Sequence, residues 1–129
     1  MRIAGYAALF GVADGALDTI RRGAFARSLE ARKVPLPLLW QHRASARIGT
    51  VERIAEDRRG LRVIARIDRQ QSRAAALLRA RAVSGLSFGY RARGFRRTPT
   101  GRVLEDIELL EISLVTHPLQ PGARVHMVE

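Results

Sequence analysis

The side chains in this sequence that could carry out chemistry are hydroxyls and imidazoles. The 129 residues include His42, His117 and His126 and six serines, but no cysteine. Without cysteine there can be no disulfide, thiolate metal site or cysteine nucleophile. Phosphate-binding loops, zinc-type His/Cys spacing and the glycine pattern of dinucleotide-binding proteins are missing too, so no metal or cofactor is expected. Most chains of this length contain both serine and histidine, so their positions must decide which of them matter.

The stretch SGLSFGY, residues 84–90, places Ser87 between two glycines. In a strand the side chains alternate, so Ser87 and the glycines would share one face while the apolar residues face a core. The Ser87 hydroxyl would then be bare, and Gly85 and Gly89 would leave space for a substrate backbone. Nearby backbone N–H groups, helped by Arg91 or Arg93, could stabilise an oxyanion. A glycine-marked bulge or barrel corner with a solvated serine is the alternative, and composition alone favours it.

His42 ends an extended segment, VPLPLLWQH, in which the last strand residues are 38–42. At the rim of a sheet it could accept a serine proton as a general base, or it could be an ordinary surface histidine. A third group would have to orient the imidazole. Glu111 and His117 have the same parity in a strand near residues 108–116, but they would lie about 20 Å apart. They cannot therefore both contact His42.

The elements that must position these residues are mostly strands. Alternating apolar residues predict strands over 2–10, on both sides of the turn EDRRG at 56–60, and over 104–116, with further strands after residue 84 and at the C-terminus. Helices are predicted over about 24–33 and within 68–82, and a loop over 11–18. The predicted strands and helices do not alternate in the βαβ order that is typical of parallel sheets. The sequence thus predicts a mainly β fold, an antiparallel, barrel-like sheet of six or seven strands with two or more external helices, in a single domain over 1–129.

The charge balance is strongly basic, with a formal net charge of +11 and 23 basic residues, of which only Lys33 is a lysine. Such an excess is typical of nucleic-acid-binding proteins. The arginines are nevertheless scattered along the chain, and the few aromatic residues form no evident base-stacking platform, so specific nucleic-acid binding is not favoured. No apolar run approaches the ~20 residues that span a bilayer, and no secretory signal is evident. A cytoplasmic setting without membrane contact is expected.

Several segments, taken in order, resemble the successive blocks of the prohead maturation proteases of tailed bacteriophages. The segments are GYAALFG, LDTIRRGAFARSL, VPLPLLWQH, IGTVERIAEDRRGLRV, AVSGLSFGYRA and LLEISLVTHPLQPGARV, and they cover roughly residues 4 to 126. Those proteases are similar in turn to the herpesvirus assembly proteases. The resemblance therefore implies a herpesvirus-protease-like fold and a serine endopeptidase.

The resemblance also implies a place of action and partners. Such an enzyme is packaged inside the immature capsid, in the cytoplasm of the bacterial host, where it trims the scaffolding segment of the major capsid protein or a separate scaffold. It often cleaves itself, and relatives suggest a homodimer. The compact chain could come from a small phage or a phage-derived gene transfer particle. The rival class is a non-catalytic capsid-assembly or DNA-associated protein that uses its arginines to contact scaffold or genome.

Carried over onto this sequence, the family's histidine is His42 and its serine is Ser87. Ser84 is the second choice for the nucleophile, because it precedes the glycine and has the opposite parity. The third member is expected to be Glu111 of the LLEISLV block, in preference to His117, although the herpesvirus relatives use a second histidine.

One residue departs from the family pattern close to the expected site. Arg43 follows the histidine at a position where an acidic residue is frequent in the family. A cation there would disfavour the imidazolium form, so it is expected to depress the pKa of His42.

Overall fold

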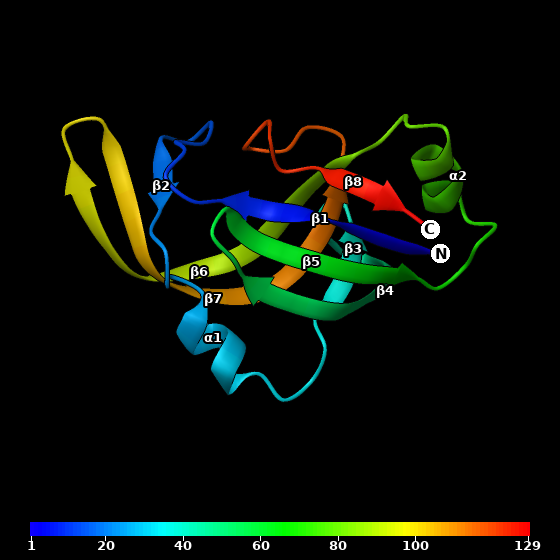
Figure 1. Cartoon of the computed structure of the whole chain (residues 1–129), viewed down its shortest axis with the longest axis horizontal. Coiled ribbons are helices and arrows are strands. Elements are labelled where there is room, and N and C mark those ends of the chain that lie inside the picture. The colour runs from blue at the N-terminus through cyan, green and yellow to red at the C-terminus, as the bar shows by residue number, and fades with distance from the viewer.

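The protein consists mainly of strands, as a computed structural model of residues 1–129 shows (Figure 1). The elements in chain order are β1 (Arg2–Leu9), β2 (Asp18–Ile20), α1 (Ala26–Ala31), β3 (Pro37–Trp40), β4 (Arg43–Glu56), β5 (Gly60–Ile67), α2 (Arg73–Arg79), β6 (Gly85–Thr98), β7 (Gly101–Val115) and β8 (Val125–Val128). The predicted mainly β class with two helices is therefore confirmed. Neither helix has the length and apolar character needed to cross a bilayer.

The strands form one eight-stranded sheet in the order β2-β7-β3-β4-β5-β1-β8, with β6 paired to β7. β4–β5 and β6–β7 are antiparallel hairpins, whereas β2 and β3 both run parallel to β7. The predicted antiparallel sheet of six or seven strands is therefore wrong in strand number and only partly right in direction, because most neighbouring strands are antiparallel but β2 and β3 are parallel to β7. The reason is that the segment β2-α1-β3 lies along one edge of the long strand β7 and runs in the same direction.

The sheet curls strongly but is not closed into a barrel. The start of β6 reaches the segment before β8 through an isolated bridge between Gly85 and Arg124. On either side of this bridge, Leu86 N donates to Ala123 O at 2.9 Å and Val125 N donates to Ser84 O at 2.7 Å. Beyond Leu86, β6 is paired only with β7, so no strand pairs with the rest of its other edge.

Inside the curl, the core contains 23 buried apolar residues. The predicted alternation of β5 is confirmed, because the side chains at the inward positions Leu61, Val63, Ala65 and Ile67 are buried. Burial of apolar side chains of this size contributes about 1.5–3 kcal/mol each, so the inward faces dominate the stability of the fold.

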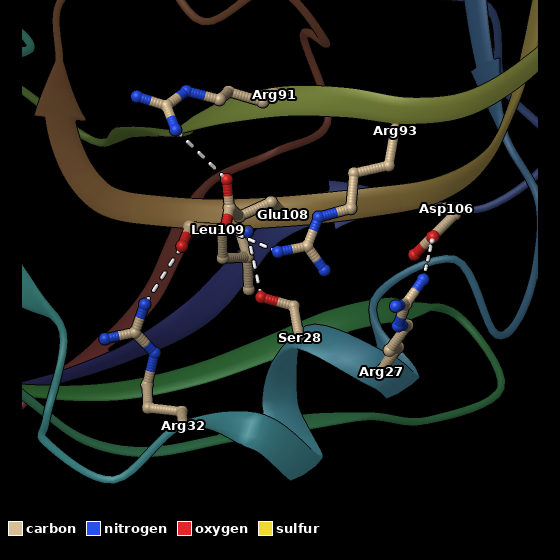
Figure 2. Close-up of polar contacts among 8 residues, drawn as sticks. All are labelled: Arg27, Ser28, Arg32, Arg91, Arg93, Asp106, Glu108 and Leu109. Carbon is tan, nitrogen blue, oxygen red and sulfur yellow. Dashed lines mark hydrogen bonds and ion pairs between the residues drawn. The ribbon is translucent and has the colours of Figure 1, made fainter.

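Helix α1 covers the part of β7 that lies between its contacts with β2 and β3. Phe25, just before the helix, is fully buried in the core. The Ser28 hydroxyl accepts a hydrogen bond from Leu109 N at 2.9 Å, and Arg32 Nη2 donates to Leu109 O at 2.9 Å (Figure 2). Side chains from α1 thus satisfy backbone groups of β7 that have no strand partner on this edge.

Helix α2 is shorter than the segment from which it was predicted. The Ser72 hydroxyl accepts a hydrogen bond from Ala75 N at 3.2 Å, which caps the helix at this residue. A serine at this position satisfies one of the free N–H groups of the first turn. The helix therefore starts at Arg73, and it buries Ala75 and Leu78.

Candidate active site

His42 lies in a tight turn between β3 and β4. Trp40 pairs with Arg43 across this hairpin, so the turn consists of Gln41 and His42 alone. Both have left-handed backbone conformations, with φ of 51° and 60°. The prediction that His42 ends an extended strand is therefore wrong. A left-handed conformation costs about 1 kcal/mol or more for a residue with a side chain, so surrounding contacts must hold this turn in place.

Gln41 supplies the first set of these contacts, all with the end of β7. Its backbone N–H donates to Leu114 O at 3.0 Å. Its side-chain amide forms a pair of hydrogen bonds with Thr116, in which Gln41 Nε2 donates to Thr116 Oγ1 and Thr116 N donates to Gln41 Oε1. The Gln41 side chain thereby continues the β3–β7 pairing by one step, after the main chain has turned away.

The His42 side chain contacts Glu111 of β7. The Nδ1 atom of His42 lies 2.5 Å from Glu111 Oε1. With the Nδ1 proton donated to the carboxylate, Nε2 is left as a proton acceptor. The hydrogen bond to Glu111 raises the pKa of His42 above its ordinary value, and this effect outweighs the opposing effect of partial burial. The expectation that Arg43 depresses this pKa is therefore wrong, because the carboxylate is in direct contact with the imidazole.

Ser113 joins the turn to the carboxylate, and sequence reasoning gave it no role. Its side chain is completely buried. Its Oγ atom accepts a hydrogen bond from His42 N at 3.0 Å and donates one to Glu111 Oε2. The available signal was a serine with the same strand parity as Glu111 in an otherwise apolar stretch. A buried hydroxyl needs partners, and these are the only ones this serine has.

Ser87 lies directly opposite Ser113 in the β6–β7 pairing. Facing residues of an antiparallel pair point to the same side, with Cβ atoms about 4.5–5.5 Å apart. Ser87 therefore shares a face with Ser113, Glu111 and the His42 turn. It is not bare as expected, because only 8% of the residue is exposed. It also borders a small cavity of about 20 Å³ whose walls include Phe88.

The glycines around Ser87 make room for the protein itself. Gly89 lies opposite Glu111, and a Cβ atom at Gly89 would be 2.6 Å from Glu111 Oε1 and 2.8 Å from its Cγ. A Cβ at Gly85 would be 2.5 Å from Val115 O. Gly89 thus provides the space in which the Glu111 side chain reaches His42, in place of the substrate backbone that the sequence suggested.

The other candidate residues form no hydrogen bond with this cluster. The Ser84 hydroxyl accepts a hydrogen bond from Arg124 Nη1 at 3.0 Å. His117 is exposed and has no hydrogen bond to another side chain, and the His126 ring packs against Tyr6 with centroids 6.0 Å apart. No three histidine, aspartate or glutamate side chains gather in a way that could hold a metal ion.

Arg91 and Arg93, suggested for the oxyanion, both bind Glu108 (Figure 2). Arg91 Nη1 lies 3.4 Å from Glu108 Oε1, and Arg93 Nη2 lies 2.5 Å from Glu108 Oε2. Both guanidinium groups are therefore engaged with this carboxylate.

The same fold occurs in solved structures of viral proteases. The capsid assembly protease of bacteriophage T4 matches with a TM-score of 0.70 and 14% identity, over 91% of this chain and 82% of that one. The KSHV protease, in complex with a hexapeptide phosphonate inhibitor, matches with a TM-score of 0.63 and 15% identity, over 96% of this chain and 63% of that one. The varicella-zoster virus protease matches with a TM-score of 0.61 and 19% identity, over 96% of this chain and 62% of that one. The chain thus spans less than two thirds of the herpesvirus proteases, and at these identities the likeness concerns the fold.

Comparison by sequence gives the family. A search of curated proteins finds no match. The family model described as caudovirus prohead serine protease matches residues 1–129. This match confirms the resemblance that the ordered segments indicated, and the chain therefore belongs to the caudovirus prohead serine protease family.

Proposed function

We propose that this protein is a serine endopeptidase of prohead maturation in which Ser87 is the nucleophile, His42 the general base and Glu111 the residue that orients His42. The observation that carries the proposal is the contact between His42 Nδ1 and Glu111, at 2.5 Å, on the sheet face that Ser87 shares. A nucleophile, a base and a group that orients the base are the elements of the serine protease mechanism.

The chemistry follows from the direction of the hydrogen bonds. Glu111 fixes the Nδ1 proton, so the free Nε2 of His42 accepts the hydroxyl proton as Ser87 Oγ attacks the scissile carbonyl carbon. The proton on Nε2 then passes to the leaving amine as the C–N bond breaks, which leaves an acyl group on Ser87. Water attacks this ester by the same route, with His42 again taking and returning a proton. Glu111 stays ionised and stabilises the imidazolium in both steps.

The Phe88 backbone N–H is the best candidate for binding the oxyanion. In β6 the backbone N–H groups alternate in direction, and that of Leu86 points away from β7 toward Ala123. The N–H of Phe88 therefore points to the same side, where β6 has no neighbouring strand. A donor at this free edge, next to the nucleophile, can stabilise the negative charge of the tetrahedral intermediate.

The substrate in this proposal is an extended, unstructured peptide. Residues 123–125 pair with the outer edge of β6 only at its start, and from Phe88 onward no strand of the protein pairs with this edge. A peptide strand that continues this line would pair its main chain with β6 and bring a peptide bond to Ser87. The scaffolding segment of the major capsid protein, a separate scaffold, or a segment of the protease itself would meet this requirement. Enclosure inside the immature capsid, which assembles in the cytoplasm of the bacterial host, would raise the effective concentration of such a substrate.

Co-expression with the cognate major capsid protein tests the proposal. We expect the capsid protein to be shortened with the wild-type protease and to remain full length with Ser87→Ala or His42→Ala. Arg93→Ala, in the same hairpin but bound to Glu108, is the matched control and should leave processing intact. Unchanged processing by either site variant would overturn the catalytic assignment. Salt-dependent DNA binding with no processing at all would favour the rival, non-catalytic function.

A further inference from the structure

We propose that Ser113 is a positioning residue that locks the His42 turn and the Glu111 carboxylate into one arrangement. The inference rests on the proposed function for its catalytic meaning. The coupling itself is a property of the three residues and can be measured without substrate.

The hydrogen bonds of Ser113 are both made within the site. Its hydroxyl has one proton, which goes to Glu111 Oε2, and it accepts the backbone N–H of His42 at 3.0 Å. Glu111 uses its other oxygen, Oε1, to bind the imidazole of the same histidine. The three residues therefore form a closed ring of hydrogen bonds: His42 backbone to Ser113, Ser113 to Glu111, and Glu111 to the His42 side chain.

The conformation of the His42 turn depends on this ring of hydrogen bonds for two reasons. The parallel pairing of β3 with β7 ends at Trp40 and Leu114, so the His42 N–H has no backbone partner. His42 also has a left-handed backbone conformation with φ of 60°, which a residue with a side chain adopts only when contacts hold it there. Ser113 Oγ is the partner of this N–H, so its loss would leave a polar group unsatisfied and the turn free to relax.

Ser28 provides a matched comparison within the same chain. It is also a buried serine, and its hydroxyl also accepts a backbone N–H, that of Leu109 in β7, at 2.9 Å (Figure 2). Its partner is a structural strand residue, and neither residue contacts His42 or Glu111. Removal of the Ser28 hydroxyl should therefore cost stability in the same way as removal of the Ser113 hydroxyl, without any effect on the imidazole.

The experiment compares Ser113→Ala with Ser28→Ala in the full chain by two measurements. The first is the pKa of His42 from NMR titration of its ring. The second is kcat and KM on a peptide that spans the mapped capsid cleavage site. For Ser113→Ala we expect the His42 pKa to fall toward its ordinary value and kcat to drop about 10- to 100-fold with KM within about twofold, because small misplacements of catalytic groups have effects of this size. Ser28→Ala should leave both quantities unchanged.

An isosteric pair removes the ambiguity of a variant that fails to fold. Ser113→Thr keeps the hydroxyl and Ser113→Val replaces it with a methyl group at nearly the same volume. The Ser113→Thr variant should retain the wild-type His42 pKa and kcat. In the Ser113→Val variant the His42 pKa and kcat should both fall. Equal behaviour of Thr and Val, or a wild-type His42 pKa in Ser113→Ala, would overturn the proposal. If no protein turns over any peptide, the protease function fails, but the NMR titration still decides whether Ser113 holds the His42–Glu111 contact.

Discussion

The two ends of the β6–β7 hairpin differ sharply in how they use polar residues. At the site end, residues 85–89 and 111–115, the polar side chains are Ser87, Glu111 and Ser113, and all three are buried. In the distal arm, residues 91–98 and 101–108, the charged residues are Arg91, Arg93, Arg96, Arg97, Arg102, Glu105, Asp106 and Glu108. In Figure 1 this arm extends away from the body of the sheet beside β2.

The difference shows where a polar contact matters. Exposed ion pairs such as Arg91–Glu108 contribute about 0–1 kcal/mol, since water and salt screen them. The contacts of Ser113 and Glu111 lie away from water, where an unpaired polar group costs about 1–3 kcal/mol. A long hairpin can thus carry many arginines at one end without disturbing the other. The basic charge of the chain suggested nucleic-acid binding. In this hairpin, however, Arg91, Arg93 and Arg96 form ion pairs with acidic residues of the same hairpin.

Among variants that keep both Ser87 and His42, the largest effect on activity should come from Glu111→Gln at the site end. Gln cannot stabilise the imidazolium or enforce the tautomer with a free Nε2, so kcat should fall by about 10³- to 10⁴-fold with the protein still folded. His117→Ala is the control, because His117 has no hydrogen bond to another side chain, and it should keep wild-type turnover. A greater loss with His117→Ala than with Glu111→Gln would make His117 the third member.

The largest effect on stability should come from the one ion pair of the arm whose carboxylate is buried. Arg102 Nε and Nη2 both lie 2.8 Å from the Asp18 carboxylate, whose side chain is only 5% exposed. These hydrogen bonds hold the pKa of Asp18 below its ordinary value. Arg102→Ala would leave the buried Asp18 carboxylate without its ion-pair partner and should lower the free energy of unfolding by about 3 kcal/mol. Urea denaturation of Arg102→Ala and Arg93→Ala checks this; an equal, small loss in both would contradict the distinction between buried and exposed pairs.

A smaller effect should follow from adding one methyl group beside Glu111. Gly89→Ala places a Cβ 2.6 Å from Glu111 Oε1, so the carboxylate must move away from His42 and kcat should fall about 10- to 100-fold. Gly94→Ala, in the arm of the same strand, brings its Cβ no closer than 3.4 Å to Asp106 and should keep full activity. Steady-state kinetics measure both variants, and an equal kcat for Gly89→Ala and Gly94→Ala would contradict this account.

The smallest effect is a displacement of the pH profile. His42 acts as a base only when neutral, and its contact with Glu111 raises its pKa. Activity should therefore fall on acidification through a pKa above the ordinary value of 6.5. In Glu111→Gln the pKa of His42 falls, so the acid limb of kcat/KM should move to lower pH. An acid limb at the same pH in both proteins would mean that Glu111 does not act on His42.

Local sequence patterns predicted much of the fold, and the family resemblance selected the candidate site. The alternation in β5 and the helix-forming run of α2 are local signals, and both elements were found. The elements depend on residues close in the sequence, where periodicity is informative. Strand parity made Ser87, His42 and Glu111 candidates, the resemblance to the prohead proteases selected them, and the structure brings Glu111 together with His42.

The missed features depend on contacts between distant residues. No strand was predicted at β2, whose three residues start at the last position of the loop predicted over 11–18, and it is a strand only because it pairs with β7. The turn at Gln41 and His42 lacks the Asn-Gly signal of such hairpins, and Thr116 and Ser113 hold it from about 70 residues away. Glu111 is a local partner of Ser113, two residues away on the same strand, but the contact with His42 is set by the tertiary structure, so the role of Ser113 could not be read before this turn was placed.

The most direct test of the central claim is covalent labelling with a fluorophosphonate, which bonds to an activated serine and needs no known cleavage site. Peptide mass spectrometry should find a single adduct on Ser87 in the wild-type protein and in Arg93→Ala. The adduct should be absent from Ser87→Ala and strongly reduced in His42→Ala, because the hydroxyl is activated by the imidazole. An adduct on another residue such as Ser84, or equal labelling of Ser87 with and without His42, would contradict the account.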